Sequence, residues 1–164
     1  MSKIVVTGAT GFIGTNLVPY LLDKGHYVLA LVRKNSSHNT RLKEHKNLKI
    51  LEVDMSEYKN LDLNEKYDIF IHLSWYGTFG SDRNDLNNQV LNIEYALDTV
   101  SLANKLGCKT YIGTGSQAEY GRCSGIIDED TKTNPETGYG IAKLCAGSLT
   151  RLRAHQLNMR HIWT

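Results

Sequence analysis

The sequence predicts an α/β protein, a doubly wound (Rossmann) parallel sheet with helices on both faces. Short apolar runs rich in Val, Ile and aromatic residues alternate with longer segments whose apolar residues recur at helical spacing. This alternation favours parallel strands joined by right-handed crossover helices. The runs that predict strands are 3–7, 26–32, 48–53, 67–73, 109–114 and 159–164.

Three segments predict the main helices. Residues 11–25 carry apolar residues at helical spacing and end at Gly25, with Pro19 predicting a kink. Residues 81–107 begin with Ser and Asp, which favour helix caps, and are expected to form one long helix. Residues 137–158 predict another. The expected apolar sides are Leu86, Val90, Ile93, Leu97 and Val100 on the former, and Leu144, Leu149 and Leu152 on the latter.

Length and composition bound the function. A chain of 164 residues predicts one domain over 1–164, and a net charge of +2 argues against nucleic acid as a partner. No run reaches the ~18 to 20 apolar residues of a membrane span, so no membrane is expected and the cytoplasm is the expected compartment. The three cysteines form no C-x-x-C pair, so no metal site is predicted.

Two polar loops, 33–41 and 121–138, are long enough to be functional. The most informative turn is the one at Gly8, Gly11 and Gly14, which lie between a predicted strand and a predicted helix. A helix N-terminus offers free N–H groups and partial positive charge, and glycine lets a pyrophosphate approach the backbone. The turn therefore predicts nucleotide binding, with a simple tight turn as the alternative.

The glycine spacing T-G-x-x-G-x-x-G, together with YGIAK at 139–143, resembles the short-chain dehydrogenase/reductase superfamily. TGATGFIG and GSQAEYG resemble its extended branch, the NAD-dependent epimerase/dehydratase family of nucleotide-sugar enzymes, and the resemblance covers 3–164. Members of that family are longer and form the nucleotide-sugar pocket from a C-terminal region. The resemblance thus implies a cofactor-binding portion that ends in the sixth strand, with the substrate region largely absent.

The catalytic candidates are Ser116, Tyr139 and Lys143. Tyr139 and Lys143 are four residues apart on a predicted helix and share a face. A neighbouring ammonium lowers the pKa of a tyrosine from its usual value of about 10, which makes the phenol a usable acid/base. The resemblance to the family's Y-x-x-x-K motif implies this role. It also implies that Ser116 orients the substrate oxygen, against the alternative of a turn serine that bonds its own backbone.

The resemblance also implies a set of cofactor contacts. Asp54 is expected to meet the adenine with Met55 beside it, the backbone of Leu73 and Ser74 to meet a ribose, and Asn92 to lie near the nicotinamide. His72 is expected to be structural. The full predicted set is Gly8, Gly11, Phe12, Ile13, Gly14, Arg33, Lys34, Asp54, Met55, Leu73, Ser74, Asn92, Tyr139 and Lys143.

The end of the second strand bears on the choice of cofactor. NAD-specific relatives carry an acidic residue there, whereas this chain has Val32 followed by Arg33 and Lys34. A cation at this place favours a 2′-phosphate, so NADP is favoured over NAD. The alternative is a basic loop that contacts only solvent.

The implied reaction is hydride transfer at a carbon of a nucleotide sugar. Dehydratases of the family place an acidic pair after the catalytic Ser or Thr, where this chain has Gln117 and Ala118, so a 4-keto-sugar reductase or an epimerase is expected. The alternatives are a cofactor-binding fragment without turnover and a reductase of a non-sugar carbonyl. A homodimer through the two long helices is also expected.

Overall fold

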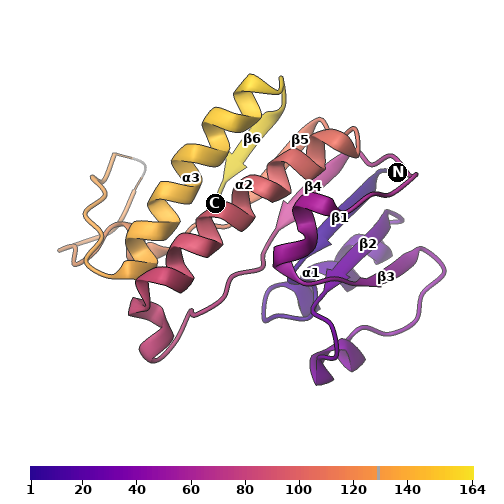
Figure 1. Ribbon diagram of the computed structural model, residues 1–164, viewed down its shortest axis with the longest axis horizontal. Coiled ribbons are helices and arrows are strands. Elements are labelled where there is room, and N and C mark those ends of the chain that lie inside the picture. Colours follow the sequence, from indigo (N-terminus) through magenta and orange to yellow (C-terminus); the bar gives the residue numbers. More distant parts are fainter. Residues whose placement is uncertain (129) are drawn as a thin grey trace.

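Six parallel strands form a single sheet, as Figure 1 shows for the computed structural model, which describes residues 1–128 and 130–164. The strand order is β3-β2-β1-β4-β5-β6, and every neighbouring pair is parallel. The predicted fold class and all the predicted strands are confirmed. The strands are β1 (Lys3–Thr7), β2 (Tyr27–Val32), β3 (Leu48–Glu52), β4 (Ile69–His72), β5 (Thr110–Gly113) and β6 (Arg160–Trp163).

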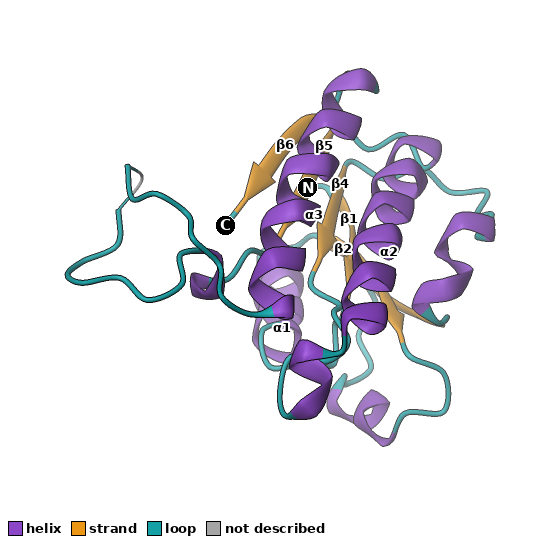
Figure 2. Ribbon diagram, turned by 60° about the vertical axis from the view of Figure 1, so that its left-hand side comes forward, coloured by secondary structure: helices purple, strands orange, loops and turns teal. Residues whose placement is uncertain are grey.

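Helices cover both faces of this sheet. The helix α1 (Gly14–Asp23) packs on one face, while α2 (Leu86–Lys105) and α3 (Gly138–Gln156) lie side by side on the other (Figure 2). The helix α1 continues through Pro19 and ends before Gly25, whose φ of 80° suits glycine. Short 3₁₀ turns occupy the connections: Ser37–Arg41, Met55–Asn60, Ser81–Asn84 and Gln117–Glu119.

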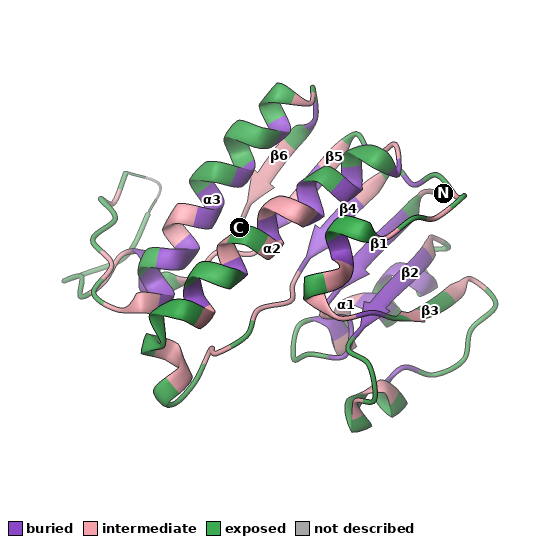
Figure 3. Ribbon diagram, in the orientation of Figure 1, coloured by how far each residue is buried: buried purple, intermediate pink, exposed green. Residues whose placement is uncertain are grey.

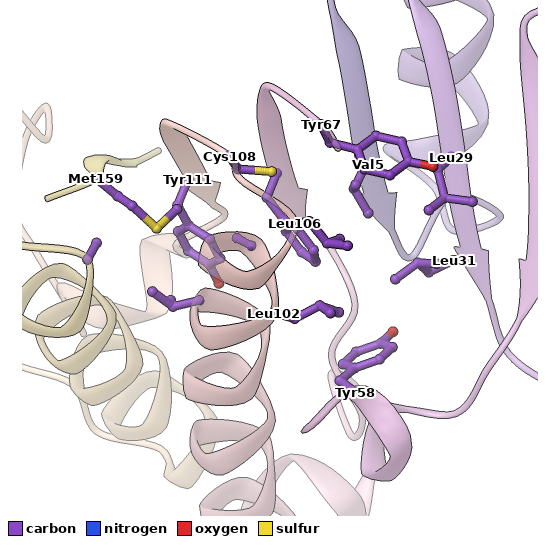
Figure 4. Packing of buried hydrophobic residues seen from close by; sticks show 14 of the residues in the cluster. Val5, Leu29, Leu31, Tyr58, Tyr67, Leu102, Leu106, Cys108, Tyr111 and Met159 are labelled. Carbon is purple, nitrogen blue, oxygen red and sulfur yellow. The ribbon is translucent and has the colours of Figure 1, made fainter. Parts of the chain in front are cut away.

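An apolar core fills each of the two spaces between the sheet and the helices that cover it. The larger one fills the space between the sheet and the helices α2 and α3, where Figure 4 shows Leu106 lying between Tyr111 on one side and Val5 and Leu29 on the other. The smaller core lies under α1 and includes Val18 and Leu22. Parallel strands buried on both faces explain the continuous Val, Ile and Leu runs of the sequence.

The prediction of one long helix over 81–107 is wrong in its first turn. Gly80, with φ at 64°, precedes a 3₁₀ turn, and the side chain of Asp85 then caps α2 by accepting a hydrogen bond from the Asn88 N–H at 3.1 Å. A capping aspartate needs non-helical backbone angles, so the chain breaks before α2 begins.

The predicted apolar sides of the long helices are right at Val100, which is buried, and wrong at four exposed residues, Leu86, Val90, Leu149 and Leu152; Ile93, Leu97 and Leu144 are half-buried. Leu86, Val90 and Leu152 are more than half exposed, and both helices instead bury small and polar residues against the sheet, such as Ala96 and Ala146 (Figure 3). Small side chains let the helix axes approach the sheet and one another closely. The exposed leucines and valine therefore remain unexplained by the core.

The loop predicted at 121–138 contains no helix or strand over residues 121–128 and 130–137, α3 begins at Gly138, and Glu129 lies outside the described residues. In the part of the chain that the structure covers, no helix is long and apolar enough to span a bilayer.

Candidate active site

The turn between β1 and α1 requires glycine. Gly8 has a φ of 64°, and an added Cβ would lie 2.7 Å from the Ser74 nitrogen and 2.8 Å from the Leu73 carbonyl carbon. A Cβ at Gly14 would collide with the carbonyls of Gly8 and Ala9. Gly8 thus lets the turn lie against the end of β4, where the strand order reverses, and Gly14 lets α1 start close to the turn.

Gly11 differs from its two neighbours. It is exposed, and an added Cβ would meet only the Gly8 carbonyl oxygen, at 3.2 Å, so that side of the backbone is otherwise open. The N–H groups of Phe12 and Ile13 have no acceptor among the described residues, because α1 begins at Gly14 without a side-chain cap. Free donors beside an open backbone at the start of a helix are the arrangement that suits an anion.

A buried hydrogen-bond cluster fixes the end of β4. The Thr7 hydroxyl oxygen accepts from the N–H groups of Leu73 at 3.1 Å and Ser74 at 3.3 Å, and it lies 2.9 Å from Nδ1 of His72. Burial, with the nearby Lys143 charge, lowers the pKa of His72 to about 3. A neutral His72 that accepts the Thr7 proton is a structural group, in agreement with the expectation.

A cleft of about 560 Å³ runs along the carboxyl edge of the sheet. It extends from the glycine turn past the ends of β2, β3 and β4 to the first turns of α2. Eight of the predicted cofactor residues line it: Gly8, Gly11, Arg33, Asp54, Met55, Leu73, Ser74 and Asn92. Phe12, Ile13 and Gly14 continue from the cleft into α1 without lining it.

The structure separates the two cations that follow β2. Arg33 is exposed and lines the cleft, whereas the Lys34 ammonium bonds the Glu57 carboxylate at 2.6 Å. That bond raises the pKa of Lys34 and lowers the pKa of Glu57. The Lys34 ammonium is therefore paired with Glu57 of the Met55–Asn60 turn. Of the two cations, Arg33 is the one that lines the cleft.

Tyr139 and Lys143 meet on the buried side of α3, as their spacing predicts. The Lys143 ammonium nitrogen lies 5.9 Å from the centroid of the Tyr139 ring and donates to the Thr114 carbonyl at 2.8 Å. Lys143 is 4% exposed, and burial lowers its pKa to about 8 against the opposing attraction of the Glu119 carboxylate.

Ser116 lies beyond the end of β5, at the predicted edge. Its hydroxyl oxygen accepts from the Ala118 N–H at 3.2 Å, and its own N–H donates to the Glu119 carboxylate at 2.8 Å. The turn role is thus present. Because that hydroxyl oxygen only accepts in this contact, its proton is left to donate to another group.

Two buried amides of α2 hold the loop that follows β4. The Asn92 amide bonds both backbone groups of Tyr76, accepting at 3.0 Å and donating at 2.8 Å. Gln89 donates to the carbonyls of Gly77 and Asp82, both at 3.0 Å. Asn92 lines the cleft, and its side chain holds the backbone of Tyr76, which is also part of the cleft wall.

Sequence reasoning missed several residues of this region: Trp75, Arg83, Gln89 and Glu119. The Trp75 indole lines the cleft and stands edge-on to Tyr139, with ring centroids 6.1 Å apart. The sequence offers one signal for this region: Gln89 and Asn92 are three residues apart and share a face of a predicted helix. Amides that are buried on such a face need hydrogen-bond partners, so the pair indicates a buried polar contact.

The comparison with protein families decides the relationship. The model of the NAD dependent epimerase/dehydratase family matches residues 4–164. The chain belongs to this family.

Curated relatives in the NAD dependent epimerase/dehydratase family are longer than this chain. It is 34% identical over 142 residues to a dTDP-6-deoxy-L-talose 4-dehydrogenase (NAD(+)) of Aggregatibacter actinomycetemcomitans, covering 86% of this chain and 51% of that protein. It is 28% identical over 163 residues to an uncharacterised UDP-glucose epimerase of Bacillus subtilis, covering 90% of this chain and 50% of the relative. The chain thus spans about half the length of these relatives.

Solved structures share the fold. A UDP-galactose 4-epimerase matches with a TM-score of 0.86 at 21% identity, over 98% of this chain and 54% of that one. A UDP-glucuronic acid 4-epimerase from Bacillus cereus in complex with NAD matches with a TM-score of 0.82 at 20% identity, over 98% and 54%.

Proposed function

We propose that the chain is the cofactor-binding half of an NAD(P)-dependent nucleotide-sugar oxidoreductase or epimerase. Within this class we favour a 4-keto-sugar reductase or an epimerase. One observation carries the proposal. The cleft at the carboxyl edge runs from the glycine turn to Trp75, and Trp75 also contacts the buried pair Tyr139 and Lys143, which do not line the cleft themselves. A dinucleotide site and an acid/base pair thus adjoin.

The residues of the cleft fit a nicotinamide dinucleotide. The positions of Gly8 and Gly14 exclude a Cβ, Gly11 leaves the backbone open, and the free N–H groups of Phe12 and Ile13 suit a pyrophosphate. Asp54 and Met55 would hold the adenosine end, and Leu73, Ser74 and Asn92 the other half. When bound, such a cofactor supplies or accepts the hydride.

The remaining roles belong to side chains of this chain. Tyr139 would exchange a proton with the oxygen of the reacting sugar carbon, and Lys143 would stabilise the phenolate and hold the ribose. Ser116 would donate its free hydroxyl proton to the same substrate oxygen. The aromatic and apolar surroundings of Lys143 would keep water from this proton transfer.

NADP is the cofactor that we propose over NAD. Arg33 lines the cleft at the end of β2, where no acidic residue precedes it, and its guanidinium suits a 2′-phosphate. Because Lys34 is paired with Glu57, we assign this task to Arg33 rather than to Lys34. On the other side, the family's own description names NAD, and the Bacillus cereus epimerase was solved with NAD.

The proposed substrate class rests on the relatives, and the proposed reaction rests on one difference between this sequence and the family's dehydratases. The relatives named above act on dTDP- or UDP-linked sugars by name, which supports a nucleotide sugar. Gln117 and Ala118 follow Ser116 in place of an acidic pair, which favours a reductase or epimerase over a dehydratase.

We also propose a homodimer through α2 and α3, in the cytoplasm. The outer sides of these helices expose several large apolar side chains: Leu86, Val90 and Leu91 on α2, and Ile141, Leu149 and Leu152 on α3. Exposed large apolar side chains on two neighbouring helices suit a subunit contact. The described cysteines are all free, which suits a reducing compartment.

Binding and turnover test the function separately. NADPH and NADH are titrated into the chain while nicotinamide fluorescence is recorded, and the loaded protein is then assayed on a panel of dTDP- and UDP-sugars, their 4-keto forms and non-sugar carbonyl compounds. Saturable binding with turnover supports the proposal. Binding without turnover supports a second candidate, a cofactor-binding protein that lacks activity, and turnover only with a non-sugar carbonyl supports a third, a reductase of a non-sugar carbonyl. Absence of binding by either nucleotide contradicts all three.

A further inference from the structure

The Lys143 ammonium lies among aromatic rings. Its nitrogen is 4.0 Å from the centroid of the Trp75 ring and 5.8 Å from that of Trp163. Among the described residues, its hydrogen-bond acceptor is the Thr114 carbonyl, although an ammonium carries three protons. The electron-rich face of an indole attracts a cation, and the Trp75 ring lies at the distance where this attraction is strong.

Trp75 is held in place from α2. Its Nε1–H donates to Oε1 of Gln89 at 2.9 Å, while the Gln89 amide nitrogen bonds the carbonyls of Gly77 and Asp82. Gln89 is 2% exposed, so this anchor is shielded from water. The indole cannot turn away from Lys143 without breaking the bond to Gln89.

The same indole contacts the phenol. Its ring stands at 90° to the Tyr139 ring with centroids 6.1 Å apart, the edge-to-face arrangement that aromatic pairs favour. Trp75 also lines the cofactor cleft. One side chain therefore touches both members of the proposed acid/base pair and the space beside them.

Burial makes this contact important. Lys143 is 4% exposed, and desolvation alone would favour its neutral amine. A neutral amine would not stabilise a phenolate and would not offer a ribose a positive charge. Cation–π attraction strengthens when water is excluded. An aromatic face is thus a means of keeping the buried amine charged.

From this geometry we infer that Trp75 is a positioning residue of the Tyr139–Lys143 pair: its indole, anchored by Gln89, holds the Lys143 ammonium charged and directed toward the phenol. The inference deepens the proposed function, since it rests on that pair as the acid/base. Other groups face Lys143: Glu119 from the turn after β5, His72 from β4, and Tyr139 with Arg83 above it.

Fluorinated tryptophans test the inference without changing the shape of the site, because fluorine withdraws electrons from the ring face. The chain has two tryptophans, so a Trp163→Phe variant carries the label at Trp75 alone. Lysine labelled with ¹³C at Cε reports the titration of Lys143 by NMR, and its resonance is assigned by its loss in Lys143→Arg. The titration is followed without cofactor from pH 6 to pH 11.

The titration midpoint of Lys143 is expected to fall with each added fluorine, by about half a unit to one unit for the tetrafluoro ring. His72 stays neutral over this range, and fluorination of Trp75 does not act on the Glu119 carboxylate directly, because the Trp75 Nε1–H bonds Gln89 whereas the Trp163 Nε1–H bonds Glu119. A midpoint that is the same across the series would overturn the inference, because it would leave Trp75 as a residue that merely fills space. The matched control is Trp75→Phe with the label at Trp163, where the 5.8 Å distance predicts a smaller fall.

A second measurement covers the case in which Trp163→Phe does not fold. The unsubstituted chain labelled at both tryptophans is then compared with labelled Trp75→Phe, and the difference isolates Trp75. Because Lys143 is observed in the free chain, the result does not depend on nucleotide binding. A midpoint that moves in a chain that binds no nucleotide contradicts the proposed function alone, and binding with an unmoved midpoint contradicts this inference alone.

Discussion

The guanidinium carbon of Arg83 lies 4.5 Å from the centroid of the Tyr139 ring. The same guanidinium donates to the Thr78 carbonyl at 2.9 Å, and the Asn84 side chain accepts from the Gly138 N–H at 2.9 Å. The segment before α2 is thus fastened onto the first turn of α3. It covers the ring of the proposed acid/base, which is 9% exposed.

Arg83→Met is expected to lower the free energy of unfolding by about 1 to 2 kcal/mol, because it removes a cation–π contact and a hydrogen bond to a carbonyl. Urea denaturation measures the change. Arg122→Met is the matched control, since the Arg122 side chain is 91% exposed in its pair with Glu136, and a change within about 0.5 kcal/mol is expected. Equal losses in the two variants would show that the contact with Tyr139 contributes nothing.

Gly8→Ala is expected to destabilise the protein by about 2 to 4 kcal/mol and to abolish nucleotide binding, because it combines a positive φ with a collision at Ser74. Gly25→Ala isolates the first of these effects. Gly25 has a φ of 80° but nothing within 4 Å of an added Cβ, so a loss of about 1 to 2 kcal/mol with binding retained is expected. Thermal unfolding and NADPH titration measure both variants.

The lowered pKa of His72 predicts that the protein loses stability in mild acid. Its folded-state pKa of about 3 lies below the ordinary value of 6.5, so between these values the unfolded chain binds a proton that the folded chain does not. The free energy of unfolding should therefore fall as pH decreases through this window, by up to about 1.4 kcal/mol per pH unit.

The measurement compares urea unfolding at pH 6.5 and pH 5 in the unsubstituted protein and in His72→Asn, whose side chain does not titrate. The carboxylates whose pKa values are lowered, such as Glu57 and Glu65, lose stabilisation in acid in both proteins and cancel in the comparison. Identical pH dependence in the two proteins would contradict the prediction.

Arg33→Gln is expected to weaken NADPH binding by about 10- to 100-fold while leaving NADH binding within about 3-fold, because only NADPH carries the 2′-phosphate. Lys34→Gln is the matched control. It should change neither affinity by more than about 3-fold, since the Lys34 ammonium bonds Glu57. If NADH binds more tightly than NADPH before any substitution, NAD is the cofactor and the role given to Arg33 is wrong.

Val90→Asp combined with Leu152→Asp is expected to convert a dimer into a monomer in sedimentation velocity. Val90 is 63% exposed and Leu152 is 56% exposed, so the substitutions should change the free energy of unfolding of the monomer little. The control pair is Tyr20→Asp on α1, which covers the other face of the sheet, with Ile50→Asp on the edge strand β3; both positions are exposed. Sedimentation of the unsubstituted chain as a monomer at high concentration would refute the dimer.

The sequence by itself determined the order of strands and helices, the glycine turn and the shared face of Tyr139 and Lys143. Each depends on a local property: the period of apolar residues, the conformational freedom of glycine, or a spacing of one helical turn. Local rules failed where two elements compete for one surface. The helices α2 and α3 bury alanines and amides because the sheet beneath them is already filled by large side chains such as Tyr111.

Only the tertiary structure decided which groups meet across the chain. It paired Lys34 with Glu57 and left Arg33 at the cleft, placed Arg83 on the Tyr139 ring, and seated Lys143 against Trp75. None of these contacts has a spacing that a sequence displays, because each joins segments brought together by the crossovers of the sheet. Their energies depend on burial and distance, which are fixed when the chain folds.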